Sequence, residues 1–289
     1  MKSALIAALL TLTPAAAFPL VAGAAPALAP SDWRTPNPDD VLVIDTSQGR
    51  VIVEMAPQLA PAHVERMREL ARRHFYDGLE FFRVINGFMA QTGDPKNDGT
   101  GQSDLPDMKA EFEFRRGARD PFVLYERLPA GGGTGVTEVG FYGAIVVRTG
   151  PAMQMIASKD GKVTGWGLFC KGSAGAARSG DPDSANSQFF LMRSTYPDLN
   201  SKYTVWGRVL SGQAAVDKLK AGPEDSQVPQ PRDTMKTVRL LSDMPEKDRP
   251  KIQVVDTRSP GFKALVEAQK AASPTPLTVC DVEIPVKVG

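Results

Sequence analysis

Two runs of β-branched and aliphatic residues mark the first clear pattern in the chain. They span residues 41–44 and 51–53, and a glycine-containing segment, 47–50, lies between them. Val and Ile favour extended backbone, and a glycine between two such runs is typical of a tight turn. The pattern therefore predicts a β-hairpin.

A helix is predicted directly after this hairpin. Pro61 suits the first helical turn, because the N–H that proline lacks would have no intrahelical partner there. Residues that can form one buried face then recur at steps of three and four, and the Asp77-Gly78 pair ends the pattern. These residues are Val64, Met67, Leu70, Ala71 and His74.

Further strand-like runs follow along the rest of the chain. They lie at 81–85, 88–91, 187–192, 204–210 and 235–241, and a short helix is predicted over 213–220, ended by Gly222. Many strands with two short, well-separated helices favour a mainly β protein. We expect a closed or nearly closed antiparallel β-barrel capped by helices, not alternating βαβ units.

Three segments fall outside this pattern. Residues 25–39 are rich in Pro, Ala and Asp and are predicted to be a linker that leads into a main domain over 40–243. Residues from about 115 to 169 interrupt that domain and are interpreted as an insertion. Residues 244–289 follow it as a C-terminal extension with a helical patch at 261–272.

Composition and charge narrow the class of partner. The 289 residues are 42% hydrophobic and 23% charged, which is typical of a globular protein. Lys and Arg total 34 against 33 Asp and Glu, so the formal net charge is only +1. Because the chain has no overall basic field, we expect no nucleic-acid partner.

The N-terminus has the pattern of a secretory signal. Lys2 precedes a short apolar run, and the small residues at 22–24, or those at 15–17, suit cleavage by a signal peptidase. Thr11 and Pro14 interrupt the region, so it is too short and broken to span a bilayer. We expect residues 1–24 to be cleaved during export, with no stable membrane insertion afterwards; an uncleaved anchor is the alternative.

The cysteines and histidines bear on redox state and metal binding. Cys170 and Cys280 are far apart in sequence and, in an oxidising compartment, would be able to form one disulfide that ties the C-terminal extension to the main domain. Two buried thiols are the alternative. The only histidines are His63 and His74, and no Cys/His cluster has metal-ligand spacing. We therefore expect no metal site.

Two side chains are candidates for chemistry. Ser173 lies in a glycine-flanked segment, but both histidines precede it, which disfavours a serine hydrolase of the nucleophile-elbow type. Arg83 is a cation within an apolar strand, and Phe88, Met89 and Gln91 follow it closely. From these residues alone, a surface or salt-bridged arginine on an edge strand is favoured over a catalytic group.

Two longer motifs connect Arg83 to a known family. The segment 81–94, FFRVINGFMAQTGD, resembles the signature of the cyclophilin-type peptidyl-prolyl cis–trans isomerases, as does Tyr76-Asp77-Gly78 before it. The segment 177–190, ARSGDPDSANSQFF, resembles the bacterial version of the second half of that family's active site. The resemblance covers roughly 40–243 apart from the insertion. It implies a cyclophilin-like closed antiparallel β-barrel of about eight strands, capped by two helices.

The resemblance also implies roles for individual residues. Arg83 matches the catalytic arginine, and Gln91 matches a polar group that holds the substrate backbone. The implied substrate-binding residues, which form a proline pocket and its groove, are Phe88, Met89, Ala177, Arg178, Gln188, Phe190, Leu199 and Tyr203. Asp198 stands where many eukaryotic members have tryptophan, and this departure is expected to weaken binding of cyclosporin-type macrocycles.

The function implied by the resemblance is isomerisation of X–Pro peptide bonds in proline-containing polypeptides. Together with the signal pattern, it predicts a bacterial periplasmic enzyme that assists the folding of exported proteins. We expect it to act as a monomer and without a cofactor. The alternative is a non-catalytic module of the same fold that binds proline-containing segments as a chaperone.

Overall fold

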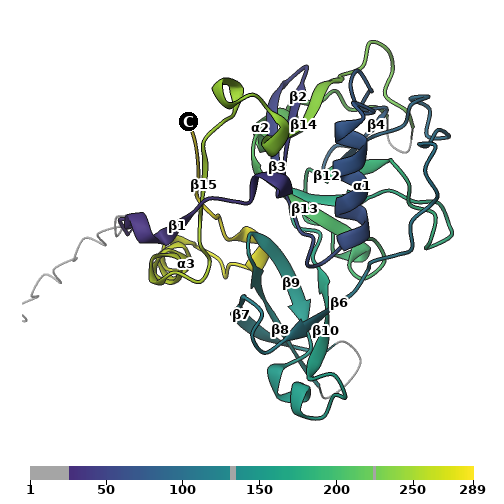
Figure 1. Ribbon diagram of the computed structural model, residues 1–289. Coiled ribbons are helices and arrows are strands. Elements are labelled where there is room, and N and C mark those ends of the chain that lie inside the picture. Colours follow the sequence, from purple (N-terminus) through teal and green to yellow (C-terminus); the bar gives the residue numbers. More distant parts are fainter. Residues whose placement is uncertain (1–25, 131–134, 224–225) are drawn as a thin grey trace, which may run out of the picture.

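The computed structural model describes residues 26–130, 135–223 and 226–289. The predicted signal segment, 1–24, lies outside the described residues. Figure 1 shows a main body with the helix α1 and a smaller sheet below it, built from β6 to β10. The helix α3 lies beside that smaller sheet.

An eight-stranded antiparallel sheet forms the main body. Its strand order is β14-β2-β3-β13-β11-β12-β5-β4, and the two edges are joined by hydrogen bonds. The N–H of Gly78 donates to the Met235 carbonyl at 2.7 Å, and the N–H of Phe81 donates to the Asp233 carbonyl at 2.9 Å. The sheet thus closes on itself, which confirms the predicted mainly β barrel. Its strands are β2 (Val41–Thr46), β3 (Gly49–Met55), β4 (Arg83–Val84), β5 (Met89–Thr92), β11 (Ser173–Ala176), β12 (Phe189–Met192), β13 (Val205–Ser211) and β14 (Met235–Leu240).

Two helices pack on the barrel core. α1 (Pro61–Arg72) contributes Val64, Met67 and Leu70 to the apolar cluster that fills the barrel, and α2 (Gln213–Lys218) contributes Ala215 and Val216. α2 ends at Lys218, so it is shorter at its C-terminal end than the helix predicted over 213–220. Burial of one apolar face per helix accounts for most of the stability of such short helices.

The N-terminus of α1 is capped by a side chain from a distant part of the chain. The Glu111 carboxylate accepts hydrogen bonds from the N–H groups of Ala62 and His63, both at 3.0 Å, and lies 2.7 Å from His63 Nδ1. Burial alone would raise the pKa of Glu111, but the hydrogen bonds from the His63 side chain and from these N–H groups lower it. Glu111 therefore fixes the start of α1 as a carboxylate.

We expect Glu111→Gln to lower the free energy of unfolding by about 1–3 kcal/mol, because charge-assisted hydrogen bonds to the helix terminus are lost. A depressed carboxylate pKa stabilises the fold above the ordinary pKa and ceases to do so as pH falls. The difference in free energy of unfolding between the variant and wild type should therefore shrink as pH falls below 4.5, the ordinary pKa of a glutamate side chain. Urea unfolding at pH 7 and pH 3.5 measures this, and an equal difference at both pH values would contradict it.

The predicted insertion forms a sheet of its own. Five antiparallel strands lie in the order β6-β10-β9-β8-β7. The 3-10 helix η3 (Ala152–Ile156) connects β9 to β10. The insertion is therefore a folded unit and not an irregular loop. The strands are β6 (Phe114–Gly117), β7 (Phe122–Pro129), β8 (Val136–Tyr142), β9 (Ile145–Thr149) and β10 (Lys162–Gly167).

The C-terminal extension packs against both the insertion and the barrel. α3 (Pro260–Ala272) places Phe262 edge-on to Phe141 of β8, with the ring centroids 5.1 Å apart. β15 (Ile252–Val255) pairs with β16 (Val286–Val288) and packs Ile252 and Val254 against the outer face of β2 and β3. Cys170 and Cys280 form a disulfide that adds a covalent link between this extension and the chain after β10.

The expected linker 25–39 is corrected by the structure, because part of it is built into the fold. β1 (Trp33–Arg34) pairs with β15, and the Arg34 guanidinium donates two hydrogen bonds to the Glu54 carboxylate, at 2.6 and 2.7 Å. The abundance of Pro, Ala and Asp predicted a linker, but cross-strand pairing and this ion pair order part of the segment. The remaining short 3-10 helices in the described chain are η1 (Pro30–Asp32), η2 (Pro38–Asp40), η4 (Pro197–Leu199), η5 (Leu241–Asp243), η6 (Glu246–Asp248) and η7 (Val279–Asp281).

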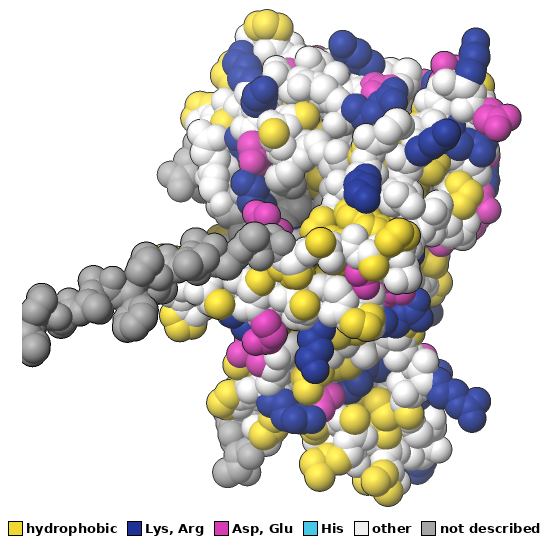
Figure 2. Space-filling view, turned by 90° about the vertical axis from the view of Figure 1, so that its left-hand side faces the viewer, with side chains coloured by type: hydrophobic (Ala, Val, Ile, Leu, Met, Phe, Trp, Pro, Cys, Tyr) yellow, Lys and Arg dark blue, Asp and Glu magenta, His cyan; other side chains and the backbone are white. Residues whose placement is uncertain are grey.

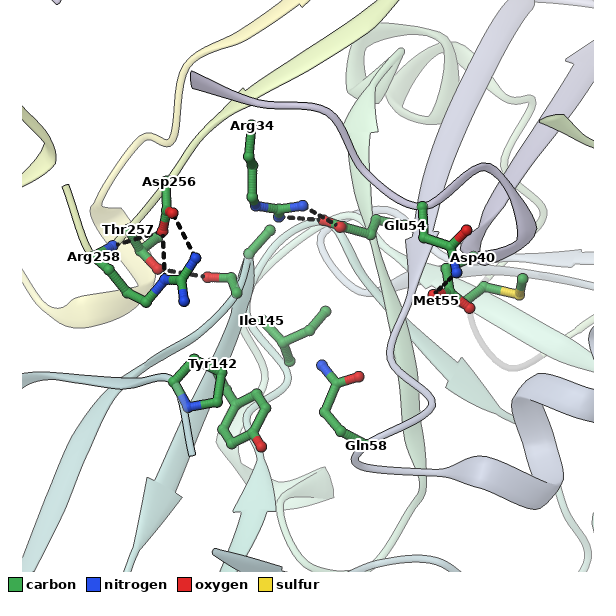
Figure 3. Close-up of a pocket in the computed structure, with 14 residues that line it drawn as sticks. Arg34, Asp40, Glu54, Met55, Gln58, Tyr142, Ile145, Asp256, Thr257 and Arg258 are labelled. Atoms are coloured by element: carbon green, nitrogen blue, oxygen red, sulfur yellow. Dashed lines mark hydrogen bonds and ion pairs between the residues drawn. The ribbon is translucent and has the colours of Figure 1, made fainter. Parts of the chain in front are cut away.

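A hollow of about 420 Å³ lies where the barrel, the insertion and both terminal segments meet. Figure 3 shows Arg34 pointing to Glu54 on one side of it and the Asp256–Arg258 ion pair on another. Each of these two arginines is thus neutralised by a neighbouring carboxylate, Arg34 by Glu54 and Arg258 by Asp256. None of the predicted site residues lines this hollow. Within the described residues, no helix has the length and apolar character needed to cross a membrane.

Candidate active site

Three predicted site residues lie side by side on adjacent strands. Arg83 of β4 is the cross-strand partner of Gln91 on β5, and Gln91 is in turn the partner of Phe190 on β12. Directly opposed residues in an antiparallel sheet point to the same face. The register alone therefore aligns a guanidinium, an amide and an aromatic ring on one side of the barrel wall.

Strand alternation separates this site from the barrel core. Ala90, Phe189 and Leu191 belong to the cluster inside the barrel, whereas Met89 and Phe190 belong to a second apolar cluster on the opposite face. The residues that share this outer face surround a hollow of about 170 Å³. A hollow of this size suits a single side chain and not a whole drug-sized ligand. Its lining residues are Arg83, Phe88, Met89, Gln91, Ala177, Arg178, Phe190, Leu199 and Tyr203.

Aromatic contacts fix the floor of the hollow. The Phe190 ring stacks on Phe169 with centroids 5.6 Å apart and meets Tyr203 edge-on at 6.1 Å. A Cβ on Gly175 would lie 2.5 Å from the Phe190 ring and 2.6 Å from the Phe169 ring. Glycine is required at this position because the two rings occupy the space of a side chain.

A chain of amide hydrogen bonds orients Gln91 toward Arg83. Arg83 Nη1 donates to Gln91 Oε1 at 3.3 Å, and Gln91 Nε2 donates to Gln188 Oε1 at 3.0 Å. Gln188 Nε2 donates onward to the carbonyl of Gly101 at 2.8 Å. Since each amide uses both its oxygen and its nitrogen, the Gln91 oxygen is held facing the guanidinium. Arg83 itself is half-buried at the edge of the hollow.

Arg178 is anchored at the rim of the hollow by neutral groups. Its guanidinium donates to the Lys202 carbonyl at 2.9 and 3.2 Å and to the Ser179 carbonyl at 2.8 Å. It also lies over the rings of Tyr203 and Phe112, with its Cζ 4.3 and 5.5 Å from the ring centroids. A half-exposed positive charge is thus held in a fixed place beside the apolar pocket.

Gln188, one of the predicted site residues, does not line the proline-sized hollow. It lies in a neighbouring one of about 290 Å³, which the segment Gly99–Gln102 borders on one side. Gln91, Ala177 and Arg178 line both hollows, so the two form adjoining parts of one groove. The second part is more polar, being bordered by Ser179, Ser184 and Asn186 as well.

Two residues of the site were missed by sequence reasoning. Phe112 precedes the insertion and reaches Arg178, and Phe169, at the end of the insertion, supports Phe190. Neither belongs to a motif that resembled the family, and both are distant in sequence from their partners. To identify them, sequence reasoning would have had to predict contacts between segments on either side of the insertion.

The structure gives no support to the other candidate chemistries. Ser173 is 4% exposed, and its hydroxyl donates to the Leu168 carbonyl at 2.9 Å, so it is not available as a nucleophile. Across the described ranges, no cluster of three or more His, Cys, Asp or Glu side chains is placed to hold a metal ion.

The chain is similar to known isomerases over the region that forms the barrel. Residues 41–240 match the model of the family "Cyclophilin type peptidyl-prolyl cis-trans isomerase/CLD". A Brucella suis protein named "Probable peptidyl-prolyl cis-trans isomerase" is 35% identical over 199 residues, which is 65% of this chain and 75% of that protein. The human "Peptidyl-prolyl cis-trans isomerase-like 1" is 27% identical over 213 residues, which is 74% of this chain and 96% of that protein.

A solved structure extends the similarity to most of the chain. The crystal structure of cyclophilin AquaCyp293 from Hirschia baltica superimposes with a TM-score of 0.77 at 33% identity, over 90% of this chain and 94% of that one. The coverage exceeds that of the family model, so the similarity reaches beyond residues 41–240. From the family match, the relatives and this shared fold, the chain belongs to the cyclophilin-type peptidyl-prolyl cis–trans isomerases, enzymes that interconvert the cis and trans forms of X–Pro peptide bonds.

Proposed function

We propose that Arg83 accelerates this isomerisation by stabilising the X–Pro amide when it is twisted halfway between its two planar forms. The barrier arises from amide resonance and is about 18–20 kcal/mol. Without a catalyst the exchange takes tens to hundreds of seconds. Since no covalent bond is made or broken, the enzyme needs only to bind the twisted amide more tightly than either planar form.

Twisting the amide creates a new hydrogen-bond acceptor for Arg83. In the planar forms the nitrogen lone pair is delocalised, whereas in the twisted form it is localised on the proline nitrogen. A guanidinium is permanently charged and carries several N–H donors in a fixed plane. A bond that forms only in the transition state lowers the barrier without tightening ground-state binding. The contact with Gln91 on the neighbouring strand supports this role, because it positions the guanidinium before the substrate arrives.

The apolar walls hold the proline ring while the rest of the bond turns. Phe88, Met89 and Phe190 line the hollow beside Arg83, and a ring with no charge and no N–H is the ligand that such walls favour. Gln91 lies between the guanidinium and the Phe190 ring, where an amide is placed to hold the substrate backbone. The co-location of Arg83 with this proline-sized hollow is the single observation that carries the proposal.

We propose further that the substrates are exported polypeptides whose folding is limited by prolyl isomerisation in the bacterial periplasm. The signal pattern of residues 1–24 supports export, and slow X–Pro exchange is a known rate-limiting step in folding. The test is twofold. Expression in a bacterial host should yield a periplasmic form whose mass corresponds to cleavage after the N-terminal signal. That form should accelerate the slow refolding phase of a protein whose native fold contains a cis-proline. A cytosolic, unprocessed product would contradict the export part alone.

The fixed charge of Arg178 predicts a substrate preference. We expect a peptide with glutamate close to the proline on its N-terminal side to be turned over about 3- to 10-fold faster, by kcat/KM, than the same peptide with lysine, since a semi-exposed ion pair is worth on the order of 1 kcal/mol. Arg178→Gln should remove this ratio while both peptides remain substrates. Equal ratios in the variant and the wild type, measured with a protease-coupled assay, would show that Arg178 does not select the substrate.

A further inference from the structure

The far end of the insertion exposes an unusual apolar surface. Met153 and Ile156 of η3 are 76% and 91% exposed, the highest values among large hydrophobic side chains in the described residues. Val136, at the start of β8, is 43% exposed. It lies at the same end of the sheet, because the N–H of Ala152 reaches the carboxylate of Glu138 on the same strand, at 3.3 Å. We call Val136, Met153 and Ile156 the apolar tip.

The short helix holds its two apolar side chains on one side. In a 3-10 helix, residues three apart eclipse one another, so Met153 and Ile156 point in the same direction. Met155 between them is only 8% exposed and anchors the turn to the sheet. The turn is also closed by hydrogen bonds from Gln154 N–H to Pro151 O at 2.9 Å and from Ala157 N–H to Gln154 O at 3.2 Å. The outward orientation is therefore fixed by packing and not by a loose loop.

The insertion around this tip carries a net positive charge. From 114 to 167 the chain has seven Lys and Arg against four Asp and Glu, a net charge of +3. The whole chain has a net charge of +1, so the remainder carries −2. Lys159, three residues after Ile156, and Lys162, at the start of β10, are both exposed, and Asp160 between them pairs with Arg115 at 2.7 Å. Figure 2 shows hydrophobic side chains beside Lys and Arg at the lower end of the molecule, where the insertion lies.

We propose that the apolar tip inserts shallowly into the surface of a membrane that contains anionic phospholipids. Exposed aliphatic side chains next to basic residues are the features that bind such a surface, where each nearby Lys or Arg contributes about 1 kcal/mol. Three apolar side chains are too few for a protein interface, which needs roughly 1,000 Å² of buried surface. Figure 1 shows the five-stranded sheet of the insertion extending away from the barrel.

Vesicle co-sedimentation tests this proposal with the chain from residue 25 onward, which contains every helix and strand of the structure and lacks the apolar leader. Two kinds of vesicle are compared, phosphatidylcholine alone and phosphatidylcholine with one quarter phosphatidylglycerol. The variant is Met153→Ser with Ile156→Ser. The matched control is Leu124→Ser, which removes a side chain 40% exposed on β7 of the same sheet. Isomerase activity, which the tip does not contact, verifies that each variant is folded.

We expect wild type and the Leu124 control to bind the phosphatidylglycerol vesicles in a salt-sensitive manner, and the double variant to bind about tenfold more weakly, since partial burial of two aliphatic side chains is worth at least 1.4 kcal/mol. Equal binding of the double variant and the wild type would overturn the proposal. So would wild type that binds no better to anionic vesicles than to neutral ones. A third outcome would also overturn it. If wild type bound no vesicles but self-associated or captured an unfolded polypeptide, and the double variant lost that ability, the apolar tip would bind a protein and not a membrane.

Discussion

Replacing Arg83 with alanine is expected to lower kcat/KM for an X–Pro peptide by about two to three orders of magnitude. The estimate follows from the loss of one preorganised donor to a charge that develops in the transition state, which costs about 2.7–4 kcal/mol in comparable sites. Arg83 reaches Gln91 Oε1 at 3.3 Å from the adjacent strand, so the variant leaves one amide acceptor without its donor but removes no part of the barrel core. A protease-coupled peptide assay measures the effect.

Two further variants make this prediction specific. Arg127→Ala removes an arginine whose side chain is 62% exposed in the insertion, and it should leave kcat/KM unchanged within error. Arg83→Lys retains the charge but not the planar set of donors, so its rate should lie between those of wild type and the alanine variant. If Arg83→Ala retained more than one tenth of the wild-type rate, the guanidinium would not be the main source of the acceleration.

Replacing Cys280 with serine is expected to lower the free energy of unfolding by about 4–5 kcal/mol. The disulfide joins residues 110 apart in sequence, and closing a loop of this length in the unfolded chain costs about that much entropy. The loss should appear in urea unfolding as a lower midpoint, with a steeper dependence on urea because the unfolded variant is less compact.

Wild type treated with reductant supplies the control for this variant. Reduced wild type and Cys280→Ser should unfold at the same urea concentration, whereas reductant should not affect the variant further. The proline hollow is lined by barrel residues and not by the extension, so kcat/KM of the folded variant should stay within about threefold of the wild-type value. Identical urea midpoints for oxidised wild type and the variant would show that the disulfide does not stabilise the fold.

The barrel was predictable because its strands and helices are each marked by a local sequence pattern, and neighbouring strands of the hairpin also follow one another in the chain. The hairpin of β2 and β3 follows from two β-branched and aliphatic runs around Gly49, and α1 follows from the spacing of Val64, Met67 and Leu70. In the site, Arg83 and Gln91 are eight residues apart and pair across neighbouring strands, so a single short motif contains both. Local signals of this kind are visible in one sequence.

The parts that were not predictable depend on contacts between distant segments. Glu111 caps a helix that begins 50 residues earlier in the chain, and Arg34, which pairs with Glu54, lies on β1 beside the C-terminal strand β15. The segment 25–39 is rich in Pro, Ala and Asp, so its composition predicted a linker, although pairing with the C-terminal extension orders part of it. Phe112 reaches Arg178 because the chain closes around the insertion. Such contacts leave no periodic signal in the sequence.

The most direct test of the role of Arg83 is to measure binding and exchange separately on the same peptide. In an NMR experiment, an Ala-Pro peptide is titrated with wild type and with Arg83→Ala, which yields the dissociation constant and the rate of cis–trans exchange on the enzyme. If the guanidinium bonds to the proline nitrogen only in the twisted form, the exchange rate should fall about 100- to 1,000-fold while the dissociation constant changes less than about threefold. Wild-type exchange in the variant, or a loss of binding that accounts for the whole loss of rate, would contradict this account.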